Sequence, residues 1–475
     1  MLFSSPFFLF FFFPIVVLIY LLINNLKIKN IFLIIVSVIF YFLGEGYNIL
    51  ILIFSVLVNY YFANKILLSL SFNKKKLYLF FGILFNILLL AFYKYYNFFI
   101  NNLNFFFNFF LISINLKNAK IDLPIGISFY TFQSISLIID IFRDKNQKKI
   151  NLSTLFLYIT LFPQLIAGPI IRFNEFKNQM RDRIINHLNI YCGIELFIIG
   201  LAKKLIIADS FGVIADDIFD DRVFDIKFSH LSMLMAWTGA IAFFIQIYFD
   251  FSGYSDMAIG LLRIFGFQIQ KNFNYPYSSL SITEFWTKWH ISLSSWFKDY
   301  LYIPLGGNRC GVIRNSINLF LVFFLCGLWH GTSYNFIIWG LYHGFFLSIE
   351  KIIRKNIFLS PGNSWIVNLI SWLYTFIIIL IGWVIFRGNN INESLHIIKT
   401  MFDFQSSIQF WSINQILTNQ IIFLLFCAGI GSFKIYDKLF NYFPKIKLIF
   451  LTLIFFMSLT YLSSNTFNPF IYFRF

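Results

Sequence analysis

The sequence predicts an all-α protein that crosses a membrane several times, and its composition is the first reason. Of its 475 residues, 59% are hydrophobic, 69 are Phe and only 12% are charged, whereas a water-soluble domain carries about 25% charged residues. The mean hydropathy is +0.75. These values exclude a disordered chain and an ordinary soluble enzyme. A polytopic membrane protein is the class that remains.

The second reason is the spacing of the apolar runs. A hydrocarbon core about 30 Å thick requires about 20 apolar residues per helix. Several of the runs are short, so we expect roughly ten to twelve membrane spans plus re-entrant or interfacial helices. The first run lacks a basic n-region and a small-residue cleavage site, so it does not read as a cleaved signal. The runs lie near 7–23, 31–43, 47–68, 77–93, 98–114, 122–142, 153–171, 189–208, 231–250, 316–330, 333–350, 365–386, 408–430 and 447–463.

The basic residues predict the orientation. They cluster at 27–29 and 73–76, whereas the turn between these clusters, 44–46, carries one Glu and no base. Because cytoplasmic loops are rich in Lys and Arg, we expect both clusters in the cytoplasm and the N-terminus on the extracytoplasmic side. The net charge of +16 then reflects loop charges and not a nucleic-acid partner. The acidic segment 216–225 fits an external loop.

No Pro- or Gly-rich linker interrupts the chain, so we expect a single integral-membrane domain over 1–475. The stretch from about 251 to 316 differs from the rest because it is less apolar and rich in aromatic and polar residues. It also contains Pro276, Pro304 and the pair Gly306-Gly307. Non-helical backbone at membrane depth must be buried in protein or line a wet cavity. This stretch is therefore where we expect the chemistry.

The signatures of soluble enzymes are absent from the sequence. It contains no G-x-S-x-G elbow, no Walker loop and no H-E-x-x-H. The four cysteines form no C-x-x-C pair, so they provide no framework for a zinc site. We predict no metal site and no tightly bound cofactor. Cys326 lies one helical turn before His330 and could form a Cys–His pair, but a buried cysteine acting as a small hydrophobe is the favoured interpretation.

Three of the six histidines are candidates for catalysis. His330 and His343 both lie in the pattern Gly-Leu-aromatic-His-Gly inside apolar runs, and His290 lies in Trp289-His290-Ile291-Ser292. An ionisable group inside a bilayer is costly and is by default a functional hypothesis. A neutral imidazole can act as a general base toward a hydroxyl or a thiol. The alternative is a buried histidine that is hydrogen-bonded to a neighbouring helix.

Polar residues near these histidines are candidates for binding. Lys298 and Arg309, together with Lys288, put positive charge close to His290 and would suit an anionic group such as a phosphorylated pantetheine carrier. The alternative is an amphipathic helix at the membrane interface. Asp250 and Ser252 follow an apolar run and either cap the next helix or line a cavity. We count Trp329 and His343 with these as candidates for lining the substrate path. The glycines spaced four apart around His330 and His343 allow a partner helix or a slim ligand to approach closely.

The sequence resembles the membrane-bound O-acyltransferase family, in the bacterial branch that includes alginate and peptidoglycan O-acetyltransferases. The resemblance covers most of the chain, and the run at 283–309 and the Trp-His-Gly within 326–331 are its most specific parts. The matching stretches are PIGISFYTFQ (124–133), FPQLIAGPIIR (162–172), YFDFSGYSDMAIG (248–260), the run 283–309, CGLWHG (326–331) and NPFIYFRF (468–475).

The resemblance implies a ring of helices around a central tunnel in the bacterial cytoplasmic (inner) membrane. It also implies acetyl transfer from a cytoplasmic donor, acetyl-CoA, toward O-acetylation of an extracytoplasmic polysaccharide such as peptidoglycan or alginate. His330 maps onto the family's catalytic histidine and His290 onto its second functional histidine. The implied partner is an exported or membrane-anchored O-acetyltransferase that acts on the polysaccharide.

Two alternatives stay open at the level of sequence. One is D-alanyl transfer in teichoic acid D-alanylation, within the same family. The other is a transporter or flippase without chemistry, although we see no repeated halves of the kind that many transporters show.

Overall fold

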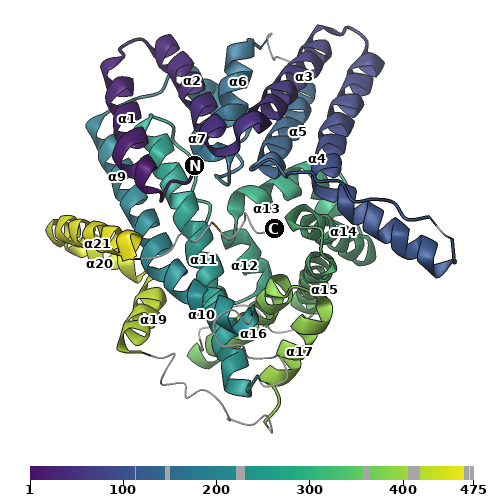
Figure 1. Cartoon of the computed structure of the whole chain (residues 1–475), viewed down its shortest axis with the longest axis vertical. Coiled ribbons are helices and arrows are strands. Elements are labelled where there is room, and N and C mark those ends of the chain that lie inside the picture. The colour runs from purple at the N-terminus through teal and green to yellow at the C-terminus, as the bar shows by residue number, and fades with distance from the viewer. Residues whose placement is uncertain are drawn as a thin grey trace. The chain divides into compact units, whose positions relative to one another are not determined.

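Helices are the regular elements throughout the part of the chain that the structure describes (Figure 1). The structure is a computed structural model, and it describes residues 1–112, 114–144, 150–220, 231–356, 364–404, 418–464 and 470. The predicted all-α class is therefore confirmed. By its contacts the chain divides into two compact units, one of residues Met1–Ile194 and Ala258–Ile269 and one of Glu195–Met257 and Gln270–Phe475. The single domain over 1–475 stays a prediction.

The first unit consists mainly of the N-terminal helices. Each helix boundary follows local chemistry: Asn25 caps α2 by accepting hydrogen bonds from the amides of Lys27 and Ile28, as Asn does at many helix starts. The elements are η1 (Phe8–Phe12), α1 (Phe13–Leu22), α2 (Leu26–Glu45), η2 (Gly46–Asn48), α3 (Ile49–Leu68), α4 (Phe72–Phe109), α5 (Ile127–Arg143), α6 (Leu152–Thr160), α7 (Phe162–Leu165), α8 (Phe173–Arg181) and the first part of α9 (His187–Ala202).

The second unit contains all three candidate histidines. Its elements are η3 (Lys203–Ala208), α10 (Asp209–Phe219), most of α11 (Met233–Ile264), η5 (Pro276–Ser278), α12 (Ile282–Lys288), α13 (Ile291–Phe297), η6 (Lys298–Tyr302), η7 (Gly307–Arg309), α14 (Val312–His330), α15 (Tyr334–Asn356), α16 (Trp365–Arg387), α17 (Ile391–Met401), α19 (Asn419–Ser432), α20 (Ile435–Tyr442) and α21 (Pro444–Ser464).

Seven stretches of the described residues are long and apolar enough to cross a membrane, so the chain is a multi-pass membrane protein. One of them, Leu26–Leu68, holds both α2 and α3. The expected number of ten to twelve spans is larger because it includes shorter apolar runs. Some of these runs form short helices, such as α5 and α6. Residues 408–417 of one expected run lie outside the described residues.

Three helix boundaries differ from the apolar runs of the sequence. The runs 77–93 and 98–114 join in the single helix α4. The run 153–171 is divided, because α6 ends at Thr160 and Pro163 begins the first turn of α7, where proline is tolerated. The run 231–250 continues as helix to Ile264, so Asp250 lies inside α11 and not at a cap.

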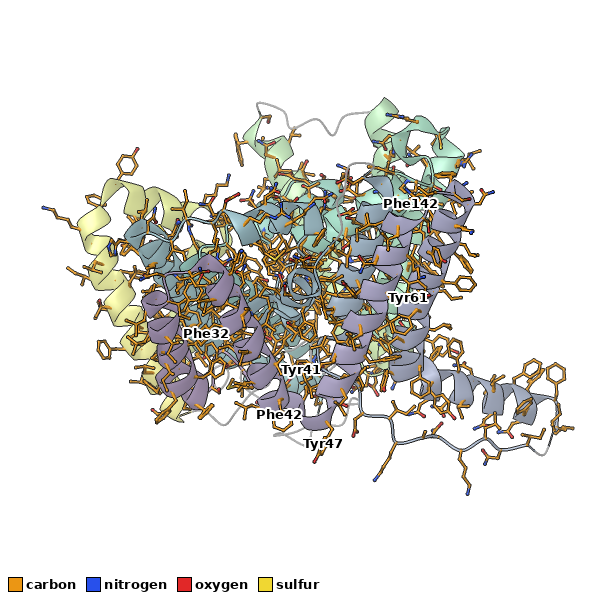
Figure 2. All side chains as sticks on the ribbon, turned by 90° about the horizontal axis from the view of Figure 1, so that it is seen from above. Phe32, Tyr41, Phe42, Tyr47, Tyr61 and Phe142 are labelled. Atoms are coloured by element: carbon orange, nitrogen blue, oxygen red, sulfur yellow. The ribbon has the colours of Figure 1, made fainter. Side chains whose placement is uncertain are left out.

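Aromatic rings on the first unit point away from its core, as expected of a surface that faces lipid. Phe42, Tyr47 and Tyr61, labelled in Figure 2, are each more than half exposed. Tyr41, next to Phe42, is buried instead, and its hydroxyl donates to the carbonyl of Ile125 at 2.9 Å. Adjacent positions on α2 thus divide between the outer surface and the core.

Candidate active site

His290 lies at a break between two short helices. The last hydrogen bond of α12 joins the amide of Trp289 to the carbonyl of Phe285. The first hydrogen bond of α13 joins the amide of Ser294 to the carbonyl of His290. At the break His290 has φ 43° and ψ 57°, a left-handed conformation that side-chain-bearing residues rarely adopt. Such strain persists only where the surroundings enforce it and often marks functional sites.

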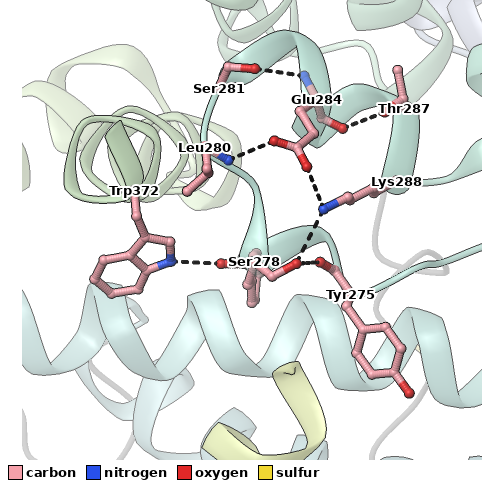
Figure 3. Close-up of polar contacts among 9 residues, drawn as sticks. Tyr275, Ser278, Leu280, Ser281, Glu284, Thr287, Lys288 and Trp372 are labelled. Carbon is pink, nitrogen blue, oxygen red and sulfur yellow. Dashed lines mark hydrogen bonds and ion pairs between the residues drawn. The ribbon is translucent and has the colours of Figure 1, made fainter. Parts of the chain in front are cut away.

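The start of α12 is fixed by two carboxylates. Ser281 caps the helix, because its hydroxyl accepts from the Glu284 amide, and the Glu284 carboxylate accepts from the amide of Leu280, the residue before the cap (Figure 3). Glu284 also pairs with Lys288 at 2.7 Å, one turn later (Figure 3). The buried carboxylate of Glu350 on α15 accepts from the amides of Ile282 and Thr283. Negative charge at a helix start is favourable, so both groups hold α12 in place before His290.

Asn272 holds the imidazole of His290. The Asn272 Oδ1 accepts from the backbone amide of Ser292 at 3.1 Å and lies 3.2 Å from His290 Nδ1. The Asn272 Nδ2 donates to the Ser255 hydroxyl at 3.1 Å. Because the amide oxygen therefore faces the ring, His290 Nδ1 carries the hydrogen and Nε2 carries the lone pair. His290 lies outside the seven candidate spans, and burial lowers its pKa to about 3.

His330 is the last residue of α14, and His343 lies inside α15. Both are buried, with exposed fractions of 6% and 0%, and His290 has 1%. The ring of His330 packs edge-on against Trp339 and Phe386, with centroids 5.0 and 5.3 Å away. These contacts pack the buried imidazole of His330 against rings from two other helices, α15 and α16.

Two tryptophans connect the three histidines. The ring centroid of Trp329 lies 6.3 Å from His290 and 4.9 Å from His330. The centroid of Trp339 lies 5.0 Å from His330 and 5.2 Å from His343. The structure thus brings together His290, His330, His343 and Trp329, which the sequence singled out. Trp339 was not among the predicted residues, although it lies four positions before His343 and on the same helical face.

The glycines of α14 and α15 allow the two helices to approach closely. A side chain at Gly327 would meet the backbone carbonyl of Phe336, and one at Gly340 would meet that of Phe323. A side chain at Gly382 of α16 would come within 2.7 Å of His343 Nε2. The expectation that these glycines serve close approach is confirmed, and the partner at Gly327 and Gly340 is a helix.

Asp250 and Ser252 are both buried inside α11. The Asp250 carboxylate lies 2.9 Å from the ammonium of Lys204, which also pairs with Asp209 at 2.8 Å. A buried cation between two acids satisfies charges that would otherwise be very costly. Neither residue caps a helix, so that alternative is wrong, and a role for them in lining the substrate path stays a prediction.

The positive residues predicted near the histidines have different surroundings. Lys288 is paired with Glu284, as described above, whereas Lys298 and Arg309 are exposed. Their role in binding an anionic group stays a prediction. Cys326 is buried, in agreement with its interpretation as a small hydrophobe.

Part of the acidic segment expected to be an external loop is helical and buried, and the side of the membrane on which it lies stays a prediction. Asp216 and Asp220 lie 2.9 and 2.8 Å from the guanidinium of Arg387 at the end of α16. Both acids pair with an arginine that lies about 170 positions away in the sequence, which the loop's composition alone does not indicate. Residues 221–225 of that segment lie outside the described residues, as do all residues of the terminal stretch 468–475 except Phe470.

Comparison with known proteins gives the chain its family. The sequence model of the membrane-bound O-acyltransferase family matches residues 128–388, a range that includes all three histidines. A Pseudomonas syringae protein named "Probable alginate O-acetylase AlgI" is 39% identical over 420 residues, 88% of this chain and 77% of the relative. The peptidoglycan O-acetyltransferase of Helicobacter pylori is 36% identical over 436 residues, 84% of this chain and 80% of the relative.

A more distant relative extends the comparison. The teichoic acid D-alanyltransferase of Bacillus subtilis is 32% identical over 282 residues, 56% of this chain and 68% of the relative. The chain is an O-acyltransferase and belongs to the membrane-bound O-acyltransferase family.

Proposed function

We propose that this protein takes acetyl groups from cytoplasmic acetyl-CoA and passes them across the membrane for O-acetylation of an extracytoplasmic polysaccharide, peptidoglycan or alginate. The observation that carries the proposal is the buried cluster of His290, Trp329 and His330 in a chain whose long alignments are to an alginate O-acetylase and a peptidoglycan O-acetyltransferase. The proposed site of action is the bacterial cytoplasmic (inner) membrane, with the N-terminus on the extracytoplasmic side.

Electrostatics favour moving the acetyl group alone. Coenzyme A is highly anionic, and a charge at the centre of a bilayer costs at least about 3 kcal/mol. A neutral acetyl group held as an ester or thioester avoids this cost. The exposed Lys298 and Arg309 supply positive charge for the phosphates of the donor, which would stay on the cytoplasmic side.

The histidines supply acid–base chemistry. In the proposed reaction His330 takes the proton of an acceptor hydroxyl while the hydroxyl oxygen attacks the thioester carbonyl carbon. The new C–O bond forms, the C–S bond breaks, and the departing thiolate takes the proton from the imidazolium, which returns His330 to its neutral form. His290 presents its Nε2 lone pair beside the same Trp329, in the orientation that Asn272 gives it.

The polysaccharide itself requires a further protein in this proposal. The acetyl group leaves the membrane on an acceptor that an exported or membrane-anchored O-acetyltransferase uses. That partner would select the polymer, so this chain would supply the acetyl group and not the choice of glycan. Trp329, His343, Asp250 and Ser252 are the proposed lining of the path.

A strain that lacks this protein tests the proposal. Ester-linked acetate, released by alkali from isolated peptidoglycan and from exported polysaccharide, is compared with that of the same strain carrying the wild-type protein. We expect acetate to be lost from one polymer and restored by the protein. Unchanged acetate on every polymer would contradict acetyl transfer.

D-Alanyl transfer to teichoic acid is the second candidate function, favoured by the 32% identity to the Bacillus subtilis enzyme. The same strains distinguish the two. If D-alanine esters decrease while acetate is unchanged, the acyl group is D-alanyl. The shorter alignment to that relative, 56% of this chain against 88% for the alginate O-acetylase, is why we place it second.

A further inference from the structure

The first unit contains a cavity of about 820 Å³ at the start of α2. Its walls come from the beginning of α2, from α6 and from α8, all within residues 25–181. The volume is in the range of sites for small molecules, which is about 300–1,000 Å³. Because α2 has 20 residues and begins a candidate span, the cavity lies at one end of a membrane-crossing helix.

The cavity is lined by cations. Lys27 at the start of α2 and Lys177 and Arg181 on α8 all line it. Among the residues that the structure describes, no carboxylate forms an ion pair with any of these three. The nearby acids Glu175 and Asp182 are both exposed. These three cations are therefore not held in described ion pairs and can contact an anion in the cavity.

Arg183 adds positive charge directly behind the cavity wall. Asn30 lines the cavity and accepts from Arg183 Nη1 at 2.6 Å. Arg183 is only 8% exposed and also donates from Nε to the Tyr20 hydroxyl at 3.1 Å. Its Nη2 has no hydrogen-bond partner in the described ranges. A buried guanidinium held by neutral groups raises the electrostatic potential of the cavity and favours an anion there.

The cavity also has an apolar part of its lining, next to the cations. Ile31 and Ile34 of α2 and Leu157 of α6 line it. Ile31 continues an exposed apolar strip along α2 that includes Ile28 and Ile35, and such a strip on a span faces acyl chains. The lining thus offers both cations for an anionic head and an apolar surface, continuous with the strip on α2, for a hydrocarbon tail.

We propose that this cavity binds the phosphate headgroup of an anionic membrane lipid, with an acyl chain lying along α2. Lys and Arg side chains are strong donors to phosphate oxygens, and basic pockets between membrane helices are suited to anionic headgroups. The apolar lining residues favour a lipid over a free phosphate. The residues that line the cavity come from 25–181, a different part of the chain from the three histidines. Lipid binding there does not require acyl transfer.

Native mass spectrometry of the detergent-solubilised full-length protein tests the proposal. The wild type is titrated with phosphatidylglycerol and, separately, with the zwitterionic phosphatidylcholine. The variant Lys27→Gln/Lys177→Gln/Arg181→Gln removes the three lining charges. The matched control Lys74→Gln/Lys75→Gln/Lys76→Gln removes three charges at the start of α4, which do not line the cavity.

We expect the wild type and the control to retain one phosphatidylglycerol more tightly than phosphatidylcholine. The cavity variant should bind it at least about tenfold more weakly, because each basic residue near an anionic lipid contributes to binding. Equal retention by cavity variant and control would overturn the proposal. Displacement of the lipid from the wild type by coenzyme A would also overturn it, because it would indicate a site for soluble phosphates. If the triple variant does not fold, Lys27→Gln/Arg181→Gln, at two exposed positions, gives the same comparison.

Discussion

His290 shows how polar contacts at one ring nitrogen can set a chemical role. Its left-handed backbone and the contact of Nδ1 with Asn272 fix both the direction of the ring and the position of its hydrogen. With a pKa of about 3, the ring is neutral throughout the physiological range. A neutral ring with a defined lone pair is the form required of a base.

Replacing Asn272 should therefore change the pH dependence of acyl transfer. In Asn272→Asp the carboxylate still accepts from Nδ1 but also stabilises the imidazolium, so the pKa of His290 rises. Activity should be preserved at high pH and lost as pH falls through the raised pKa, whereas wild-type activity should not be limited by His290 over the same range. The measurement is the rate of acetyl transfer against pH in isolated membranes.

Two further variants make this test specific. Asn272→Leu removes the acceptor and should lose activity at every pH, by roughly tenfold or more. Asn174→Asp adds the same charge at an exposed position of α8 and should leave the profile unchanged. Identical pH profiles for wild type and Asn272→Asp would mean that Asn272 does not orient His290.

The histidines could be predicted from sequence, but the residues that hold them could not. His330 and His343 are conspicuous because ionisable groups are rare in apolar runs, and His290 because it lies in the polar, aromatic-rich stretch where the sequence predicts the chemistry. Asn272 and Glu350 act through contacts with residues 18 and about 67 positions away. An Asn in a polar stretch of sequence does not indicate which distant residue it contacts. Glu350 is an acid at the end of an apolar run, and this position could have indicated that it contacts a polar group elsewhere in the fold.

At the scale of elements, the pair α14 and α15 positions two of the histidines, and glycines set how closely the pair packs. At Gly340 a β-carbon would meet the backbone carbonyl of Phe323 on the neighbouring helix, which cannot move aside as a side chain can. Gly340→Ala should therefore separate the helices and destabilise the protein by about 1–3 kcal/mol.

The matched control is Gly429→Ala on α19, where a β-carbon meets nothing within 4 Å. Alanine there should be neutral or slightly stabilising, since it favours helix more than glycine does. Thermal unfolding in detergent compares the two, with activity measured alongside. If both variants melt at the wild-type temperature, then close packing at Gly340 is not required for stability.

Helix positions could be predicted better than helix ends. Apolar runs identify where helices form, because hydrocarbon requires them. They do not show that α4 continues across two runs, or that α11 continues past Asp250. In α11 the charge of Asp250 is tolerated inside the helix because it pairs with Lys204 on another element. That compensation depends on the tertiary structure.

At the scale of the whole chain, composition and motifs predicted the class and the family. Low charge and long apolar runs indicate a membrane protein, and the run at 283–309 with the Trp-His-Gly motif indicates the acyltransferase family. The basic cavity of the first unit was not predicted. Its cations, Lys27, Lys177 and Arg181, come from two segments far apart in the sequence, and only the fold brings them together.

The proposed acyl transfer requires the buried histidine cluster, and replacing one histidine of the cluster tests this requirement. Ester-linked acetate on the acceptor polymer is compared between cells carrying the wild type, His330→Ala, or His396→Ala at equal membrane levels. His396 is exposed on α17 and serves as the matched control. We expect wild-type acetate for His396→Ala and a loss of about 100-fold or more for His330→Ala, as for removal of a general base. Undiminished acetate with His330→Ala would contradict the account.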